Sequence, residues 1–206
     1  KPLSLFKTKI VILVIEFTKP EYVKIGIEFI ISKQFPTIDC ILNSKGLMLK
    51  TGKKGENWIG IAPFAQYESK VYPLDLMQQV IDDLAKNKKH KIFLFGGGTT
   101  EINKLNQLQN RHDNVIVVAG KVAFQEEIQL ISNLDVMLSM DSGNAHIAAM
   151  LGVKVITLWG ATHPFAGFKP FNQPDDFCLT SDRSNYPLLP TSVYGNKQVK
   201  GYDEVM

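Results

Sequence analysis

The feature that most constrains the fold is a regular alternation that begins at Trp58. Apolar runs of five or six residues alternate with segments whose apolar side chains recur every three or four positions. The runs predict buried strands and the segments predict helices. Because the connections are short, the strands should form a parallel sheet covered by helices on both faces, which is an α/β, doubly wound, Rossmann-like fold. The expected strands are 58–63, 91–95, 115–119, 135–140 and 154–158, and the expected helices are 73–88, a segment through Ile102 and Leu108, a segment through Phe124 and Ile131, and 144–151.

The two ends of the chain are less regular. An apolar run predicts a strand at Ile10–Phe17, helical spacing predicts a helix within Glu21–Lys33, and glycines and lysines predict a loop at Lys45–Asn57. One further strand is expected at 176–180, and the tail 181–206 has turn residues but no periodicity.

Polar or glycine-rich segments follow four of the expected strands. These segments are 65–70, 96–101, 141–146 and 160–164. Ligands of doubly wound sheets bind beyond the carboxyl ends of the strands. The four segments are therefore expected to meet at one ligand site.

The turn Asp141-Ser142-Gly143 leads from a strand into a short helix. Asp141 or Ser142 can cap that helix, Gly143 lets backbone approach a ligand, and the first helical N–H groups form a site for an anion. His146 lies one turn further along, within reach of such an anion. A capped helix with an incidental histidine explains the same residues equally well.

The order of these motifs resembles the C-terminal, nucleotide-sugar domain of the ADP-heptose:lipopolysaccharide heptosyltransferases, glycosyltransferase family 9. The resemblance rests on D-S-G-N-A-H-I-A-A-x-x-G-V, a strand, and then W-G-A-T-H-P, and it extends over roughly residues 57–172. It implies the C-terminal half of an inverting glycosyltransferase with two facing Rossmann-like domains, the GT-B arrangement. In such an enzyme an acceptor hydroxyl attacks the sugar and a nucleoside diphosphate leaves.

The resemblance also implies a division of the chain. Residues 1–56 are interpreted as a remnant of the N-terminal domain with the interdomain linker, 57–180 as the nucleotide-sugar-binding domain, and 181–206 as a C-terminal tail. The family's general base is an acidic residue near the start of the N-terminal domain, and residues 1–56 are too few to form that domain. We therefore expect this chain to bind nucleotide sugar but to have little or no activity alone.

Three residues are expected in catalytic roles. By resemblance, Lys70 meets the diphosphate, Asp141 contacts the donor sugar and His146 hydrogen-bonds the diphosphate. A lysine at this point can neutralise a leaving diphosphate, although an exposed loop lysine is the simpler alternative. The family often places hydroxyl groups early in this loop, where the chain has Ala65 and Gln66.

Five further residues are expected to bind the donor. Glu101 would accept hydrogen bonds from the ribose diol, or would merely complement a helix dipole. Ser142 and Gly143 would offer hydroxyl and N–H groups to phosphate, and Thr162 would shape the same mouth. Gly120 would lie beneath the base, or would serve a simple strand-to-helix turn.

Composition adds few constraints. The net charge of +3 and a pI near 8.7 fit a polyanionic ligand without demanding one, and no pattern is typical of nucleic-acid binding. Cys40 and Cys178 lack partners at metal-ligand spacing, so we expect free thiols and no metal site. The run Ile10–Phe17 is too short to span a bilayer. Three other histidines, His90, His112 and His163, are interpreted as surface or loop residues, although His163 is close enough in sequence to Thr162 to remain a candidate for the site.

The sequence leaves three candidate functions. The first is the donor-binding half of an enzyme that moves a sugar, heptose by resemblance, from an ADP-linked donor to a lipid-linked saccharide acceptor bound by an N-terminal domain. Such an enzyme needs no cofactor beyond its donor and works in the cytoplasm, at the inner face of a membrane. The second is a non-catalytic or degenerate nucleotide-binding homologue. The third is a nucleotide-sugar epimerase, which is disfavoured because Glu101, Glu126, Glu127 and Asp141 form no recognisable catalytic set.

Overall fold

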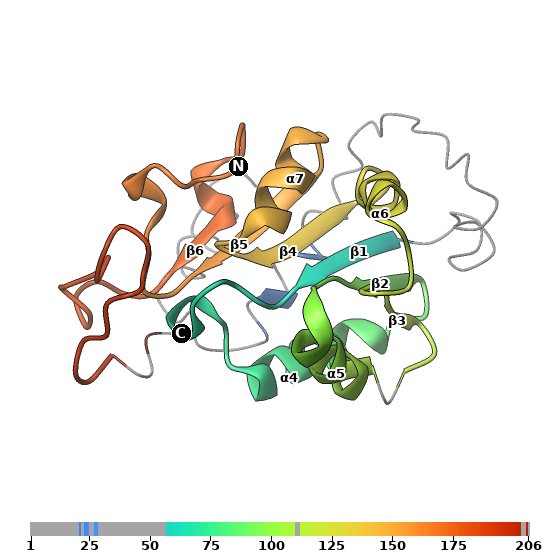
Figure 1. Cartoon of the computed structure of the whole chain (residues 1–206), viewed down its shortest axis with the longest axis horizontal. Coiled ribbons are helices and arrows are strands. Elements are labelled where there is room, and N and C mark those ends of the chain that lie inside the picture. The colour runs from blue at the N-terminus through green and yellow to red at the C-terminus, as the bar shows by residue number, and fades with distance from the viewer. Residues whose placement is uncertain are drawn as a thin grey trace, which may run out of the picture.

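A six-stranded, wholly parallel sheet forms the centre of the molecule (Figure 1). The computed structural model describes residues 57–109, 112–202 and 205, together with Glu21, Val23, Lys24, Ile27 and Glu28. The strand order is β3-β2-β1-β4-β5-β6, which confirms the predicted doubly wound α/β fold. The strands are β1 (Asn57–Ala62), β2 (His90–Leu94), β3 (Val115–Val117), β4 (Val136–Met140), β5 (Lys154–Trp159) and β6 (Cys178–Thr180).

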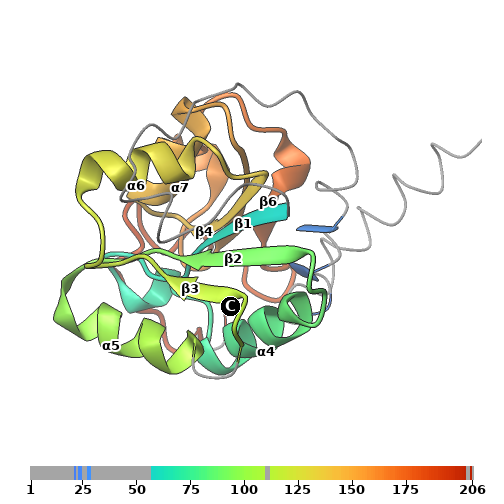
Figure 2. The ribbon, with the colours of Figure 1, turned by 90° about the vertical axis from the view of Figure 1, so that its right-hand side faces the viewer.

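Helices cover both faces of this sheet (Figures 1 and 2). On one face lie α4 (Leu74–Ala85) and α5 (Gly98–Gln109), and on the other lie α6 (Phe124–Ile131) and α7 (Gly143–Met150). Three short 3-10 helices occur in the connections: η1 (Glu68–Lys70), η2 (Pro164–Ala166) and η3 (Asp175–Phe177). The right-handed crossovers of parallel strands produce this two-sided arrangement.

Two apolar clusters fill the space between sheet and helices, one on each face. All five residues of β4 are buried, as expected for a central parallel strand with helices on both sides. On α4 the predicted apolar face is confirmed, since Met77, Ile81 and Leu84 are fully buried. Phe124, at the first position of α6, is instead 63% exposed, because the buried residues of that helix are at its other end.

Most element bounds agree with the sequence pattern to within a few residues. The helix expected at 73–88 ends at Ala85, and a turn follows in which the His90 N–H donates to the Asn87 carbonyl. His90 then begins β2 and is 3% exposed, so its interpretation as a surface residue was wrong. Its Nδ1 lies 3.0 Å from the Leu84 carbonyl oxygen and its Nε2 lies 3.0 Å from Asn87 Nδ2, which satisfies both ring nitrogens.

Less of the N-terminal segment is described. Its five described residues are helical, and Val23 and Ile27 are buried in the same cluster as α4, in agreement with the helix predicted within Glu21–Lys33. The strand predicted at Ile10–Phe17, the loop before Asn57 and Cys40 lie outside the described residues.

Three further observations bear on function. Cys178 is a buried free thiol, and burial raises its pKa to about 11. Within the described part of the chain, no helix is long and apolar enough to cross a membrane. The same residues contain no group of three or more His, Cys, Asp or Glu side chains placed to hold a metal ion.

Candidate functional site

A cavity of about 260 Å³ lies where the chain connections diverge from the sheet. Strands β1 and β4 are neighbours, paired from Ile59↔Val136 to Ala62↔Ser139, but β1 leads to β2 on one side and β4 leads to β5 on the other. This divergence opens a crevice beyond their carboxyl ends. The cavity walls come from the segments after β1, β2 and β4, and include Ala65, Gln66, Phe95, Gly96, Glu101, Ser142, Gly143, Asn144 and Ile147.

The N-terminus of α7 forms one wall of this cavity. Ser142 is the N-cap residue, yet no side chain caps the helix. The Ser142 hydroxyl lies 3.0 Å from the Ser139 hydroxyl instead, and the Asp141 carboxylate is engaged elsewhere, so the expectation of a side-chain cap was wrong. Gly143 and Asn144, the first two residues of α7, line the cavity at the positive end of the helix dipole, whereas the Ala145 N–H donates to the Ser142 carbonyl at 3.2 Å.

Gly143 leaves this wall open. A Cβ built at Gly143 would meet nothing within 4 Å. The residue is exposed and faces the cavity, so no protein packing requires a glycine here. The space is available to a bound molecule, as a close approach of backbone to ligand needs.

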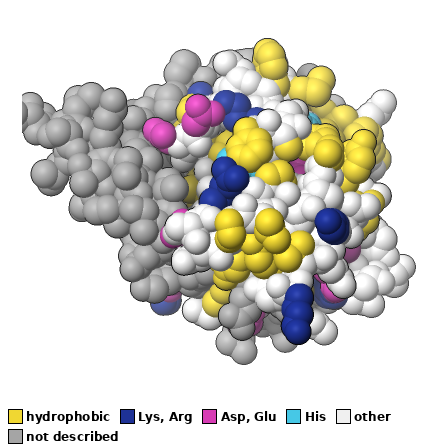
Figure 3. Space-filling model, turned by 90° about the vertical axis from the view of Figure 1, so that its left-hand side faces the viewer, with side chains coloured by type: hydrophobic (Ala, Val, Ile, Leu, Met, Phe, Trp, Pro, Cys, Tyr) yellow, Lys and Arg dark blue, Asp and Glu magenta, His cyan; other side chains and the backbone are white. Residues whose placement is uncertain are grey.

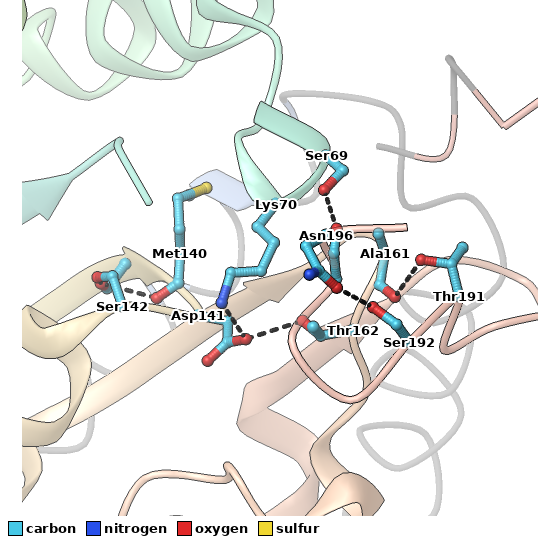
Figure 4. Close-up of polar contacts among 12 residues, drawn as sticks. Ser69, Lys70, Met140, Asp141, Ser142, Ala161, Thr162, Thr191, Ser192 and Asn196 are labelled. Carbon is cyan, nitrogen blue, oxygen red and sulfur yellow. Dashed lines mark hydrogen bonds and ion pairs between the residues drawn. The ribbon is translucent and has the colours of Figure 1, made fainter. Parts of the chain in front are cut away.

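Asp141, Lys70 and Thr162 form a largely buried polar cluster (Figure 4). None of the three lines the cavity, but Ser142, the next residue after Asp141, does. The Lys70 Nζ lies 2.8 Å from Asp141 Oδ2, and the Thr162 hydroxyl donates to the same oxygen at 2.9 Å. The side chains of Lys70 and Asp141 are 11% and 7% exposed. The alternative of an exposed loop lysine is therefore excluded, and a charge-assisted ion pair fixes the position of the ammonium group.

Glu101 is placed as the sequence predicted, but its contact with a ribose stays a prediction. It lies in the first turn of α5, lines the cavity, and its Oε2 accepts the Gly97 N–H at 2.8 Å. Gly120 does not line this cavity. Its φ is +71°, and a Cβ there would be 2.8 Å from Ile102 Cδ1, so packing of the turn against α5 accounts for the glycine.

His146 is not among the residues that line the described cavity, although Gly143, Asn144 and Ile147 of the same helix are. Its predicted contact with a diphosphate stays a prediction. Asn144 and Ile147 were missed by the sequence reasoning, although the spacing of four residues between Gly143 and Ile147 indicates a shared helix face.

Exposed aromatic side chains occur in the segment after β5 and in the tail. Figure 3 views the carboxyl-end side of the sheet, where hydrophobic side chains gather with Lys and Arg among them. Phe165 and Tyr194 are 60% and 61% exposed. The Phe165 ring lies 3.9 Å from the His163 ring, and the Arg183 guanidinium lies 5.2 Å from the Phe165 centroid.

His163 should make the stability of the protein depend on pH. Burial, and secondarily the Arg183 charge, lower the pKa of His163 below 6.5, and its Nδ1 accepts the Phe165 N–H at 3.4 Å, which needs the neutral ring. A histidine with a lowered folded-state pKa favours folding above its unfolded pKa, and this contribution is lost as the pH falls through the folded pKa. Chemical unfolding of wild type and His163→Gln between about pH 8 and pH 5 should show wild type losing more stability. Parallel curves for the two proteins would contradict this expectation.

The chain is similar in sequence to a known protein family and to several of its members. The model of glycosyltransferase family 9 (heptosyltransferase) matches residues 28–194. The lipopolysaccharide heptosyltransferase 3 of Escherichia coli is 30% identical over 110 residues, which cover 52% of this chain and 32% of that protein. The lipooligosaccharide heptosyltransferase 2 of Campylobacter jejuni is 28% identical over 121 residues, covering 56% and 37%.

Solved structures agree on the fold. The E. coli heptosyltransferase WaaC with ADP superposes with a TM-score of 0.54 at 20% identity, covering 63% of this chain and 42% of that one. A family 9 glycosyl transferase from Veillonella parvula gives a TM-score of 0.59 at 17% identity, covering 75% and 44%. The chain spans less than half the length of each of these relatives. With a family model matching most of its residues, the chain belongs to glycosyltransferase family 9, the heptosyltransferase family.

Proposed function

We propose that this chain is the donor-binding half of an inverting glycosyltransferase that uses an ADP-linked sugar, heptose in the first instance. The observation that carries the proposal is the cavity at the ends of β1 and β4. It is lined both by the N-terminus of α7, which no side chain caps, and by Glu101. A nucleoside diphosphate needs both kinds of group, N–H donors for its phosphates and an acceptor for its ribose. Family membership and the solved structure of a relative with ADP support this choice of ligand.

The cavity offers a position for each part of the donor. The diphosphate would lie against Ser142, Gly143 and Asn144, at the positive end of the α7 dipole. The ribose hydroxyls would donate to Glu101, whose carboxylate keeps acceptor capacity beyond the bond from Gly97.

Lys70 would stabilise the leaving diphosphate. Its ammonium has three N–H donors, and the Asp141 carboxylate takes one of them. Charge on the leaving group grows as the glycosidic bond breaks, so a cation already fixed in place lowers the barrier without reorganisation. With Asp141 at the sugar and His146 near the phosphates, the proposed reaction uses the nucleotide sugar as substrate and needs no separate cofactor.

The remaining parts of the reaction belong to the rest of the full-length protein. An N-terminal domain would supply the general base and bind a lipid-linked saccharide acceptor of the lipopolysaccharide type. The named activities of the relatives support this acceptor class. Such an enzyme would work in the cytoplasm, associated with the inner face of the membrane that carries its acceptor.

Calorimetric titration tests the donor site. We expect ADP to bind in preference to UDP and GDP, and we expect Glu101→Gln to weaken ADP and AMP alike by about tenfold, because a hydrogen bond to a charged group contributes roughly 1.5–3 kcal/mol. The matched control is Glu127→Gln on α6, a half-buried glutamate outside the cavity. Equal affinities for all three diphosphates, or equal effects of the two substitutions, would contradict the proposal.

A second candidate is a nucleotide-binding homologue without transferase activity. The presence of Ala65 and Gln66 in the cavity wall favours it, because the family often has hydroxyl groups there. The full-length protein distinguishes the two: transfer of heptose from ADP-heptose to a lipopolysaccharide core acceptor identifies the enzyme, whereas ADP binding without transfer identifies the homologue.

A further inference from the structure

The loop 191–196 of the tail is hydrogen-bonded at two points to the segments that carry Lys70 and Thr162. The Thr191 N–H donates to the Ala161 carbonyl at 2.9 Å, next to Thr162. At the other end the Ser69 hydroxyl donates to the Gly195 carbonyl, next to Lys70. Figure 4 shows these segments side by side. The loop is thus bound to the chain neighbours of two members of the polar cluster.

A third hydrogen bond, between backbone groups, links the remaining two segments. The Ala161 N–H donates to the Ser69 carbonyl at 2.9 Å. Three segments far apart in sequence, namely η1, the turn after β5 and the tail loop, are therefore hydrogen-bonded pairwise around Lys70 and Thr162. Within the loop, the Gly195 N–H donates to the Ser192 carbonyl at 3.3 Å and the Ser192 hydroxyl donates to Asn196 Oδ1 at 2.8 Å.

Gly195 lies directly against the lysine. Its φ is +71°, and a Cβ built there would be 3.0 Å from Lys70 Cδ, 3.1 Å from Lys70 Cγ and 2.9 Å from Thr162 Cγ2. Gly195 is buried. Its bare backbone therefore packs on the aliphatic stem of the lysine so closely that an added Cβ would force the Lys70 and Thr162 side chains to shift.

We propose that Gly195 is a positioning residue, which holds the Lys70 ammonium on Asp141 by confining the lysine stem. A free lysine side chain has many rotamers, and confinement of the stem selects the one that points Nζ at Asp141. In its consequence for ligand binding this inference rests on the proposed function, because the fixed ammonium then meets the diphosphate of the donor.

The test compares Gly195→Ala with Gly201→Ala in the full chain. Gly201 has a φ of +82° in the same tail, but a Cβ there meets nothing within 4 Å. Both substitutions impose the backbone cost of a left-handed alanine, and only Gly195→Ala displaces Lys70. We expect Gly195→Ala to weaken ADP at least about fivefold more than Gly201→Ala does, with adenosine affinity the same in both, since the lost contact is with the diphosphate.

Repeating both substitutions in a Lys70→Ala background shows whether Gly195 acts through the lysine. There the two glycine variants should bind ADP equally. A loss specific to Gly195→Ala that persists without Lys70, or no difference between the glycine variants in its presence, would overturn the inference. Ser69→Ala, which removes one hydrogen bond and adds no atoms, should reproduce the ADP-selective loss in smaller degree and serves if Gly195→Ala does not fold.

The outcome for wild type separates this inference from the proposed function. If wild type does not bind ADP, the proposed function fails, and the inference is decided by thermal unfolding. Gly195→Ala should then lower Tm more than Gly201→Ala in the native background, with the excess reduced once Lys70→Ala removes Cγ and Cδ. An unreduced excess would overturn it.

Discussion

Lys70→Met lowers the free energy of unfolding by about 3–5 kcal/mol, the expected cost of leaving one partner of a buried ion pair alone. Asp141 would keep its carboxylate at 7% exposure with only the Thr162 hydroxyl as a hydrogen-bond partner among the described contacts. Methionine has a similar length and fills the space of the stem, so the loss reports the charge rather than a cavity. Chemical denaturation at neutral pH measures it.

Two further variants test whether the loss comes from the buried ion pair. Lys70→Met with Asp141→Asn should be more stable than Lys70→Met alone, because a neutral amide costs less to bury than an unpaired carboxylate. Lys86→Met breaks an ion pair with Asp83 whose lysine is 72% exposed, and should leave stability nearly unchanged. Equal losses for Lys70→Met and Lys86→Met would show that the buried pair is not what holds this part of the site together.

Asn144→Asp should change stability and ligand affinity in opposite directions. Asn144 lies in the first turn of α7 and lines the cavity. A carboxylate there complements the helix dipole, which stabilises the fold by about 0.3–1 kcal/mol. The same charge repels a bound diphosphate by several kcal/mol, on the order of a hundredfold in affinity.

The matched control is Asn106→Asp, an exposed position on α5 outside the cavity. It adds the same net charge and should leave ADP affinity within about twofold of wild type, since water and salt weaken the effect of an exposed charge outside the cavity. Calorimetry with ADP and thermal unfolding measure both variants. Equal ADP affinities for the two would place the diphosphate somewhere other than the N-terminus of α7.

The fold was predictable because the signals that specify it are local. Each run such as Val136–Met140 is apolar throughout, as a strand buried on both faces must be, and the short connections leave little choice of topology. The same pattern also predicted at which end of the sheet the site lies, since Glu101 and the Ser142–Gly143 turn both follow strands. Gly143 and Glu101 do line one cavity.

Predictions failed where a distant residue competed with a local rule. Asp141 has the sequence context of a helix cap, but Lys70, 71 positions away, binds its carboxylate. Gly195 lies in a tail without periodicity and contacts Ser69 from 126 positions away. Long-range pairing of this kind leaves no period in the sequence.

Amide NMR of the 206-residue chain during titration with ADP tests the central claim most directly. The account predicts that the shifted amides include Gly96, Gly143 and Asn144, which line the cavity at the ends of β1, β2 and β4. The amides of Val199 and Tyr202, which line a second cavity of about 240 Å³, should stay unchanged. Saturable shifts confined to that second cavity, or no shifts at the N-terminus of α7, would contradict a nucleotide site at the crevice between β1 and β4.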